Sequence, residues 1–194
     1  MSKITNTGLF ITEGAAAGTD VAGNGQIWVK SDTPSSLYHT DDAGNDLRMG
    51  GFMVTAEVAT TSGASVDVTG IPAGVRNVIV FLQGVSTSGT SEMCIQLGDS
   101  GGIETSGYLA CAWDGDNADG QTARLILTFG MAAGETRDGA IRLALADVTN
   151  NTWVSTGLLN QGSSSSLMNG SSGTKSLSGA LTQIRITTVG GSDT

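Results

Sequence analysis

The chain has 194 residues and a formal net charge of −9, because 18 acidic side chains outnumber 9 basic ones. Such a surface repels nucleic-acid phosphates and anionic lipids, and no apolar run approaches the roughly 20 residues that span a bilayer, so we expect neither nucleic-acid binding nor membrane insertion. The 29 glycines in a Ser/Thr-rich chain predict few helices, since glycine costs about 1 kcal/mol relative to alanine inside a helix.

Residues 1–50 contain short apolar clusters separated by turns rich in Gly, Asn and Asp. The clusters are Leu9–Ile11, Gln26–Val29 and Leu37–His39. This pattern predicts short strands joined by hairpins. Because isolated hairpins are marginally stable in water, we expect the segment to pack against another surface. We expect residues 1–50 to form a β-hairpin arm, with Gly50-Gly51 as a joint to a main domain over residues 51–194.

From residue 52 onward the strand signals are longer and evenly spaced, which is typical of an antiparallel β-sandwich or jelly roll. The sequence predicts nine strands there, Phe52–Thr60, Ser65–Thr69, Val75–Val85, Glu92–Leu97, Tyr108–Trp113, Arg124–Phe129, Ala140–Val148, Thr152–Leu158 and Thr182–Val189.

The pattern of apolar residues within these strands predicts which faces are buried. Residues 141–145 and 184–186 alternate aliphatic with polar or small side chains, so Arg142 and Arg185 should face water. Residues 78–82 and 125–127 are apolar without alternation. We expect these two runs to be central strands covered on both faces, near a subunit interface.

Turn and loop signals separate the predicted strands. Asn150-Asn151 can adopt left-handed conformations at low cost, which predicts a tight hairpin between residues 148 and 153. The low-complexity stretch Gln161–Gly179 predicts a long surface loop with room for one short strand. Recognition usually lies in such loops on a rigid scaffold.

The two cysteines, Cys94 and Cys111, lie on neighbouring predicted strands, and the sequence does not show whether they reach bridging distance. The first residues lack the apolar region of a secretory signal, which predicts a soluble chain that folds in a reducing cytosol. Two free thiols are therefore favoured over a disulfide.

A catalytic function is not favoured. His39 is the only histidine, it lies in the N-terminal segment, and a hydrolase of the nucleophile-and-base type needs a positioned base. The acidic residues 99, 104, 114 and 116 could pair as in glycosidases, but each adjoins turn formers and should be solvated. The three tryptophans could stack on sugars, although tryptophan on a strand usually packs in a core or interface.

The segment Asp114–Gly120 invites comparison with a calcium loop, because clustered carboxylates can form an oxygen cage. Its register departs from the EF-hand pattern, since Ala118 stands at position five and no glutamate stands at position twelve. An acidic exposed turn is favoured, and we expect no metal and no cofactor.

Two segments resemble known structural proteins. Residues 23–46 follow the pattern Gly-x-Gly-Gln-aliphatic-Trp-Val-Lys, then Thr-Pro, then Thr-Asp-Asp-x-Gly. This pattern resembles a short module of fibre and other virion proteins of tailed bacteriophages. Residues 68–108 are similar to a β-rich domain of phage and prophage structural proteins.

The resemblance implies a virion surface protein that attaches through its N-terminal part and assembles as a homotrimer in the host cytoplasm. Trp28, Lys30, Tyr38 and His39 are then the candidate residues for attachment to other virion proteins. No heptad run, β-helix repeat or long shaft is present, so a short tail-fibre knob for host attachment and a head decoration protein both remain open.

Two further functions remain as alternatives, a glycan-degrading tail spike and a free carbohydrate-binding module. If the protein contacts a host surface glycan, the receptor-facing loops should be Asp114–Gly120 and Gln161–Gly173. The candidate residues in these loops are Asp114, Asp116, Asp119, Ser164 and Asn169.

Overall fold

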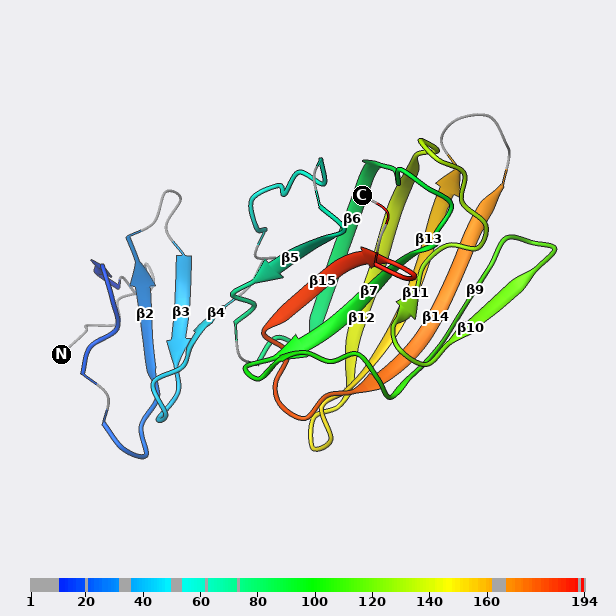
Figure 1. Cartoon of the computed structure of the whole chain (residues 1–194). Coiled ribbons are helices and arrows are strands. Elements are labelled where there is room, and N and C mark those ends of the chain that lie inside the picture. Colours follow the sequence, from blue (N-terminus) through cyan, green and yellow to red (C-terminus); the bar gives the residue numbers. More distant parts are fainter. Residues whose placement is uncertain are drawn as a thin grey trace. The chain divides into compact units, whose positions relative to one another are not determined.

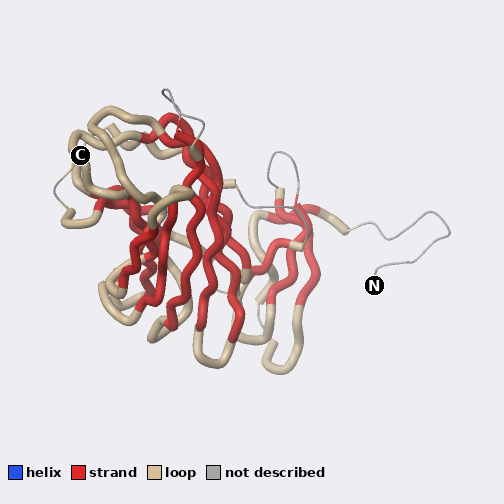
Figure 2. Tube along the Cα trace, turned by 90° about the vertical axis from the view of Figure 1, so that its right-hand side faces the viewer, coloured by secondary structure: helices blue, strands red, loops and turns tan. Residues whose placement is uncertain are grey.

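The computed structural model describes residues 11–19, 21–31, 36–49, 54–61, 63–72, 74–161, 167–191 and 193. All regular structure in these ranges is strand, which confirms the all-β prediction (Figures 1 and 2). The chain divides into two compact units, residues 1–56 and 57–194. The expected joint Gly50-Gly51 lies outside the described ranges.

The N-terminal unit contains one four-stranded sheet in the order β1-β2-β3-β4. Its strands are β1 (Glu13–Gly14), β2 (Gln26–Lys30), β3 (Ser36–Thr40) and β4 (Asp46–Arg48). Strands β2 and β3 pair in antiparallel register, with Trp28 opposite Tyr38. The predicted short strands at residues 26–29 and 37–39 are thereby confirmed, whereas the cluster Leu9–Ile11 lies mostly outside the described ranges.

The C-terminal unit contains two sheets (Figure 1). The six-stranded sheet has the order β10 (Ala118–Gln121), β9 (Tyr108–Trp113), β14 (Met168–Ser176), β13 (Thr152–Gln161), β12 (Arg137–Asp147), β6 (Asn77–Val85). The five-stranded sheet has the order β11 (Leu125–Ile126), β7 (Met93–Asp99), β15 (Gln183–Thr188), β5 (Ser65–Thr69), and β8 (Gly102–Ile103) pairs with β7.

The two sheets enclose one hydrophobic core, so this unit is a β-sandwich. Core side chains come from both sheets, for example Ile141 and Leu143 of β12 and Ile95 and Leu97 of β7, all fully buried. Burying a side chain of this size stabilises the fold by about 1.5–3 kcal/mol. The chain alternates between the sheets, and the meander β12-β13-β14 enlarges one of them.

The predicted alternation in β12 and β15 is confirmed. Ile141 and Leu143 face the core while Arg142 between them is exposed. In β15, Ile184 is buried and Ile186 packs partly against the core.

The prediction that residues 78–82 form a central strand was wrong, whereas the expectation that a neighbouring subunit covers their outer face stays a prediction. Strand β6 lies at the edge of the six-stranded sheet, next to β12 only. Leu82 faces the core, but Ile79 and Phe81 remain 39% and 76% exposed. Residues 125–127 are buried throughout, as predicted, although only Leu125 and Ile126 form a strand and β11 also lies at a sheet edge.

Other strand boundaries also differ from the prediction. Residues 54–60 are not in a strand, whereas β10 and β14 fall where an acidic turn and a long loop were expected. Strand β14 has low intrinsic β-propensity, but it is hydrogen-bonded between β13 and β9, and this pairing outweighs propensity. A residue larger than glycine would clash at position 173 of β14, since its Cβ would lie 2.6 Å from the Ala110 Cβ.

The turn between β12 and β13 confirms the Asn-Asn prediction in part. Asn151 has a φ of 48°, in the left-handed region that asparagine tolerates better than most residues. The Asp147 carboxylate accepts hydrogen bonds from the backbone N–H groups of Thr149 and Asn150, which closes the turn.

Two buried cations stabilise the inside of the sandwich. Arg137 is fully buried and forms a 3.1 Å ion pair with Glu135. Lys175 forms an ion pair with Glu104, and its Nζ lies 5.2 Å from the centre of the Tyr108 ring. Each cation is therefore compensated by a carboxylate, as buried charges require.

Candidate functional site

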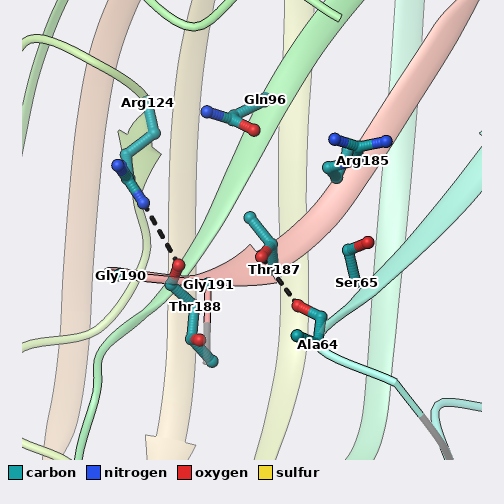
Figure 3. A pocket seen from close by; sticks show the side chains of 9 residues that line it. All are labelled: Ala64, Ser65, Gln96, Arg124, Arg185, Thr187, Thr188, Gly190 and Gly191. Carbon is teal, nitrogen blue, oxygen red and sulfur yellow. Dashed lines mark hydrogen bonds between the residues drawn. The ribbon is translucent and has the colours of Figure 1, made fainter. Parts of the chain in front are cut away.

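A polar pocket of about 290 Å³ lies on the outer face of the five-stranded sheet, where β5, β7 and β15 run side by side (Figure 3). It is lined by Ala64, Ser65, Gln96, Arg124, Arg185, Thr187, Thr188, Gly190 and Gly191. None of these side chains is acidic. Figure 3 shows Arg124 and Arg185 on opposite sides, with Gln96 between them.

Arg124, just before β11, forms one wall of the polar pocket. Its Nη1 donates a 3.1 Å hydrogen bond to the carbonyl oxygen of Thr188, while its buried Nε has no hydrogen-bond partner among the described residues. The thiol of Cys94 is close by, and burial raises its pKa to about 11 in spite of the opposing effect of Arg124. No carboxylate in the described ranges lies within ion-pair distance of Arg124.

Arg185 on β15 forms the opposite wall. Its Nε and Nη2 donate 2.7 Å hydrogen bonds to the two carboxylate oxygens of Asp67 on β5. The hydrogen bond from Arg185 holds the pKa of Asp67 below its ordinary value. Gln96 donates from Nε2 to the carbonyl oxygen of Ala123, which leaves its Oε1 as an acceptor.

The four predicted attachment residues lie on two different faces of the N-terminal sheet. The rings of Trp28 and Tyr38 stack with centroids 5.1 Å apart, and Lys30 Nζ lies 5.6 Å from the Tyr38 centroid. Trp28 Nε1 donates a 2.9 Å hydrogen bond to Thr40 Oγ1. His39 points to the other face, because it neighbours Tyr38 on the same strand and successive side chains alternate.

The face that carries His39 is mainly apolar. His39 is opposite Ile27 on one side and Leu47 on the other, and Leu37 lies two residues along the same strand. Ile27 is 57% exposed, and Leu37 and Leu47 are also exposed. This sheet thus has one face ordered by the aromatic stack and one apolar face exposed in the single chain.

The predicted acidic turn is confirmed, but it is shorter than expected. Asp114 Oδ1 accepts hydrogen bonds from the backbone N–H groups of Asp116 and Asn117, which lowers the pKa of Asp114. Asp119 belongs to β10 and accepts a hydrogen bond from Gln121. Among all residues that the structure describes, no three His, Cys, Asp or Glu side chains form a metal-binding group.

The second predicted receptor-facing segment is corrected in large part. Asn169 is buried on β14, where its Oδ1 accepts a hydrogen bond from Arg137 and its Nδ2 donates to the Phe129 carbonyl oxygen. It is therefore an interior residue and cannot face a receptor. Ser164 lies outside the described ranges.

The outer face of the six-stranded sheet is a larger surface, which the sequence analysis did not predict. Three rows of register partners cross this face: Phe81, Ala140, Leu158, Gly170, Trp113 and Ala118; Ile79, Arg142, Thr156, Ser172, Cys111 and Gly120; Asn77, Ala144, Val154, Thr174 and Leu109. We call these rows the apolar outer face. They contain no carboxylate, and Arg142 is their one charged side chain.

The large apolar side chains of this face are exposed to water. Phe81 is 76% exposed, Leu109 71%, Leu158 57% and Trp113 50%. They come from three strands, β6, β9 and β13, so only pairing in this register places them on one face. The signals in the sequence were the breaks in alternation near residue 81 and the paired leucines at 158 and 159.

Both cysteines are free. Cys94 is buried on β7 of the five-stranded sheet, whereas Cys111 is exposed on β9 within the apolar outer face. The two thiols belong to different sheets, in keeping with the favoured prediction.

Within the described part of the chain, no helix is long and apolar enough to cross a bilayer. In comparisons with known proteins, no family model matches the sequence, and no curated protein or solved structure matches it.

Proposed function

We propose that this protein is a non-enzymatic structural component of a tailed-phage virion surface, assembled in the host cytoplasm as a homotrimer. It would form a short tail-fibre knob for host attachment or decorate the head. The resemblance of residues 23–46 and 68–108 to segments of such proteins supports this function. The observation that carries the proposal is the apolar outer face, which a single chain leaves exposed.

The size of the apolar outer face favours a protein partner. Large side chains present about 150–250 Å² each, so Phe81, Leu109, Trp113 and Leu158 together expose on the order of 500 Å². This sum, to which Leu109 contributes from a separate row, is within the range of about 300–600 Å² for the largest apolar patch on a soluble monomer, and such patches are often functional. It would supply more than half of the roughly 800 Å² that each partner buries in a stable interface.

The charge of the apolar outer face favours a second copy of the chain as that partner. The chain carries a net charge of −9, so most pairings of its surface would bring carboxylates together. The three rows of this face lack carboxylates. Copies can therefore meet here around a symmetry axis without bringing carboxylates together, and the one charged side chain of each copy in these rows, Arg142, is hydrogen-bonded to Asn77.

The N-terminal sheet is the proposed attachment element. Its four short strands have one face ordered by Trp28 and Tyr38 and another exposing Ile27, Leu37 and Leu47. Covering the exposed apolar face of this sheet with another surface would stabilise it, because apolar area is removed from water. In our proposal another virion protein supplies that surface, with Lys30 and His39 at its two faces.

The acidic residues support a non-enzymatic function, because they form turns and ion pairs. Asp99 accepts hydrogen bonds from the Gly101 backbone and the Ser178 hydroxyl, and Glu104 pairs with Lys175. Glycosidase carboxylates must instead face a substrate cleft as a pair.

Light scattering on the purified protein tests the oligomer. We expect a mass of three chains of 19.6 kDa at micromolar concentration. The double substitution Phe81→Ser and Leu158→Ser should yield folded monomers. As a control, Val148→Ser changes a side chain that is 61% exposed outside the three rows and should leave the trimer intact. A monomeric wild-type protein would contradict the proposal.

Detection in purified particles tests the location. Gold-labelled antibody should mark either the tail tip or the head, and a variant lacking residues 1–56 should fail to join the particle. Absence of the full-length protein from purified particles would rule out the virion function.

A further inference from the structure

The polar pocket points to a binding function beyond assembly. We propose that it binds the oxyanion group, carboxylate or phosphate, of a small anionic ligand such as an acidic sugar. The inference does not depend on where the protein is located, because it rests on Arg124, Arg185 and Gln96 within a single sandwich (Figure 3).

The charge of Arg124 is the first argument. Its guanidinium has five N–H donors and no acceptor. One donor reaches the Thr188 carbonyl oxygen, and within the part of the chain that the structure describes the buried Nε has no hydrogen-bond partner. Leaving a buried donor unsatisfied is costly, and no described carboxylate neutralises this cation. An oxyanion in the pocket would bring the missing negative charge and would accept hydrogen bonds from the remaining N–H groups of the guanidinium.

The opposite wall provides orientation. Arg185 donates hydrogen bonds from Nε and Nη2 to Asp67, and this carboxylate compensates its positive charge. The remaining N–H groups of the guanidinium are available to donate to a ligand. The two guanidinium groups therefore differ in function. Arg124 supplies the uncompensated charge, and Arg185 supplies fixed donors held in place by the bidentate pair.

The volume of the pocket and its uncharged polar side chains restrict the size and chemistry of the ligand that can bind. A volume of about 290 Å³ is near the lower end of ligand pockets, which suits a single sugar residue or a similar small acid. Gln96 Oε1 and the hydroxyls of Ser65 and Thr187 can accept or donate hydrogen bonds to sugar hydroxyls. A bare oxyanion would use only the guanidinium donors of the pocket.

Binding at one site should be weak, with a dissociation constant on the order of 1 mM, because a ligand of this size makes few contacts. Ligand-observed NMR on the full-length protein measures this range. The titrants are sodium glucuronate, glucose as the neutral match, and sodium phosphate. We expect saturable binding of glucuronate and none of glucose, with weakening as salt concentration rises.

Variants locate the site. Arg124→Gln should weaken glucuronate binding at least tenfold. Ser65→Glu places a carboxylate at an exposed position of the pocket and should have the same effect by repulsion. The control Arg76→Gln removes an exposed arginine that lies outside both the pocket and the apolar outer face, and it should bind as wild type does. Thermal melting of each variant verifies the fold, and Ser65→Glu keeps the test valid if Arg124→Gln unfolds.

The results of the titrations distinguish between a carboxylated sugar and a free oxyanion as the ligand. Glucuronate binding without phosphate binding supports a carboxylated sugar, and binding of both supports recognition of the oxyanion itself. The proposal is overturned if neither anion binds at tens of millimolar, if glucose binds equally well, or if Arg76→Gln loses as much affinity as Arg124→Gln. None of these outcomes depends on particle location, so the virion proposal can fail separately.

Discussion

Arg137 and Asn169 meet inside the sandwich, where Arg137 Nε donates a 3.2 Å hydrogen bond to Asn169 Oδ1. The contact joins β12 to β14 across β13, and both side chains are buried. Asn169→Ala should therefore lower the free energy of unfolding by about 1–3 kcal/mol, because a buried donor of Arg137 loses its acceptor. Urea denaturation measures this loss. Asn117→Ala, at an exposed turn position, should change stability by less than about 0.5 kcal/mol.

The Glu104 carboxylate should make stability depend on acidic pH. Burial alone would raise the pKa of Glu104, but hydrogen bonds from Lys175 and Ser178 hold it below its ordinary value. A lowered pKa in the folded state means that the stabilisation is present above the unfolded-state pKa of about 4.3 and is lost as pH falls through the folded-state pKa.

Glu104→Gln should remove this contribution. At pH 7 we expect a loss of about 3 kcal/mol, because buried Lys175 would lose its counter-charge. Between pH 5 and pH 3 the variant should show a shallower decline than the wild type. Urea titrations at each pH test this, with the exposed Glu57→Gln as the control. Parallel pH profiles for Glu104→Gln and the wild type would contradict it.

Gly170 leaves space for the indole of Trp113 on the apolar outer face. A Cβ at residue 170 would lie 2.3 Å from Trp113 Nε1, so Gly170→Ala should displace the indole into water. We expect red-shifted tryptophan fluorescence and weaker self-association with a small change in stability. Gly120→Ala, where the nearest atom to a Cβ is 3.7 Å away, should leave both unchanged.

Cys111 offers a probe of self-association, since it lies in the middle row of the apolar outer face. Its reaction with a maleimide should be fast in monomers and at least tenfold slower in the oligomer. Cys94 should stay unreactive in both, because burial raises its pKa to about 11. Equal labelling rates at nanomolar and micromolar protein concentration would argue against burial of this face between copies.

The fragment 57–194 should fold without the N-terminal unit. All members of the hydrophobic core belong to this fragment. We expect cooperative thermal unfolding with a midpoint within a few degrees of the full chain. A broad, non-cooperative transition would show that residues 1–56 contribute to the core.

The sequence by itself determined the all-β class and the strands whose local signals are strong. Ser65–Thr69 and Tyr108–Trp113 were predicted with their observed bounds, and the alternation of residues 141–143 identified the inner face of β12. These features follow from short-range chemistry, because β-branched residues and period-two patterning act within one strand.

Tertiary structure decided where the strands lie and which side chains meet. Strand β14 is made of small polar residues and exists because β13 and β9 supply its hydrogen bonds. The sequence predicted Asn169 to be a loop residue. It is buried in the structure, because the pairing of β14 directs its side chain toward Arg137. Arg124 and Arg185 are 61 positions apart in the chain and share a pocket only through sheet order. Such contacts depend on register and on the packing of two sheets, which no local pattern encodes.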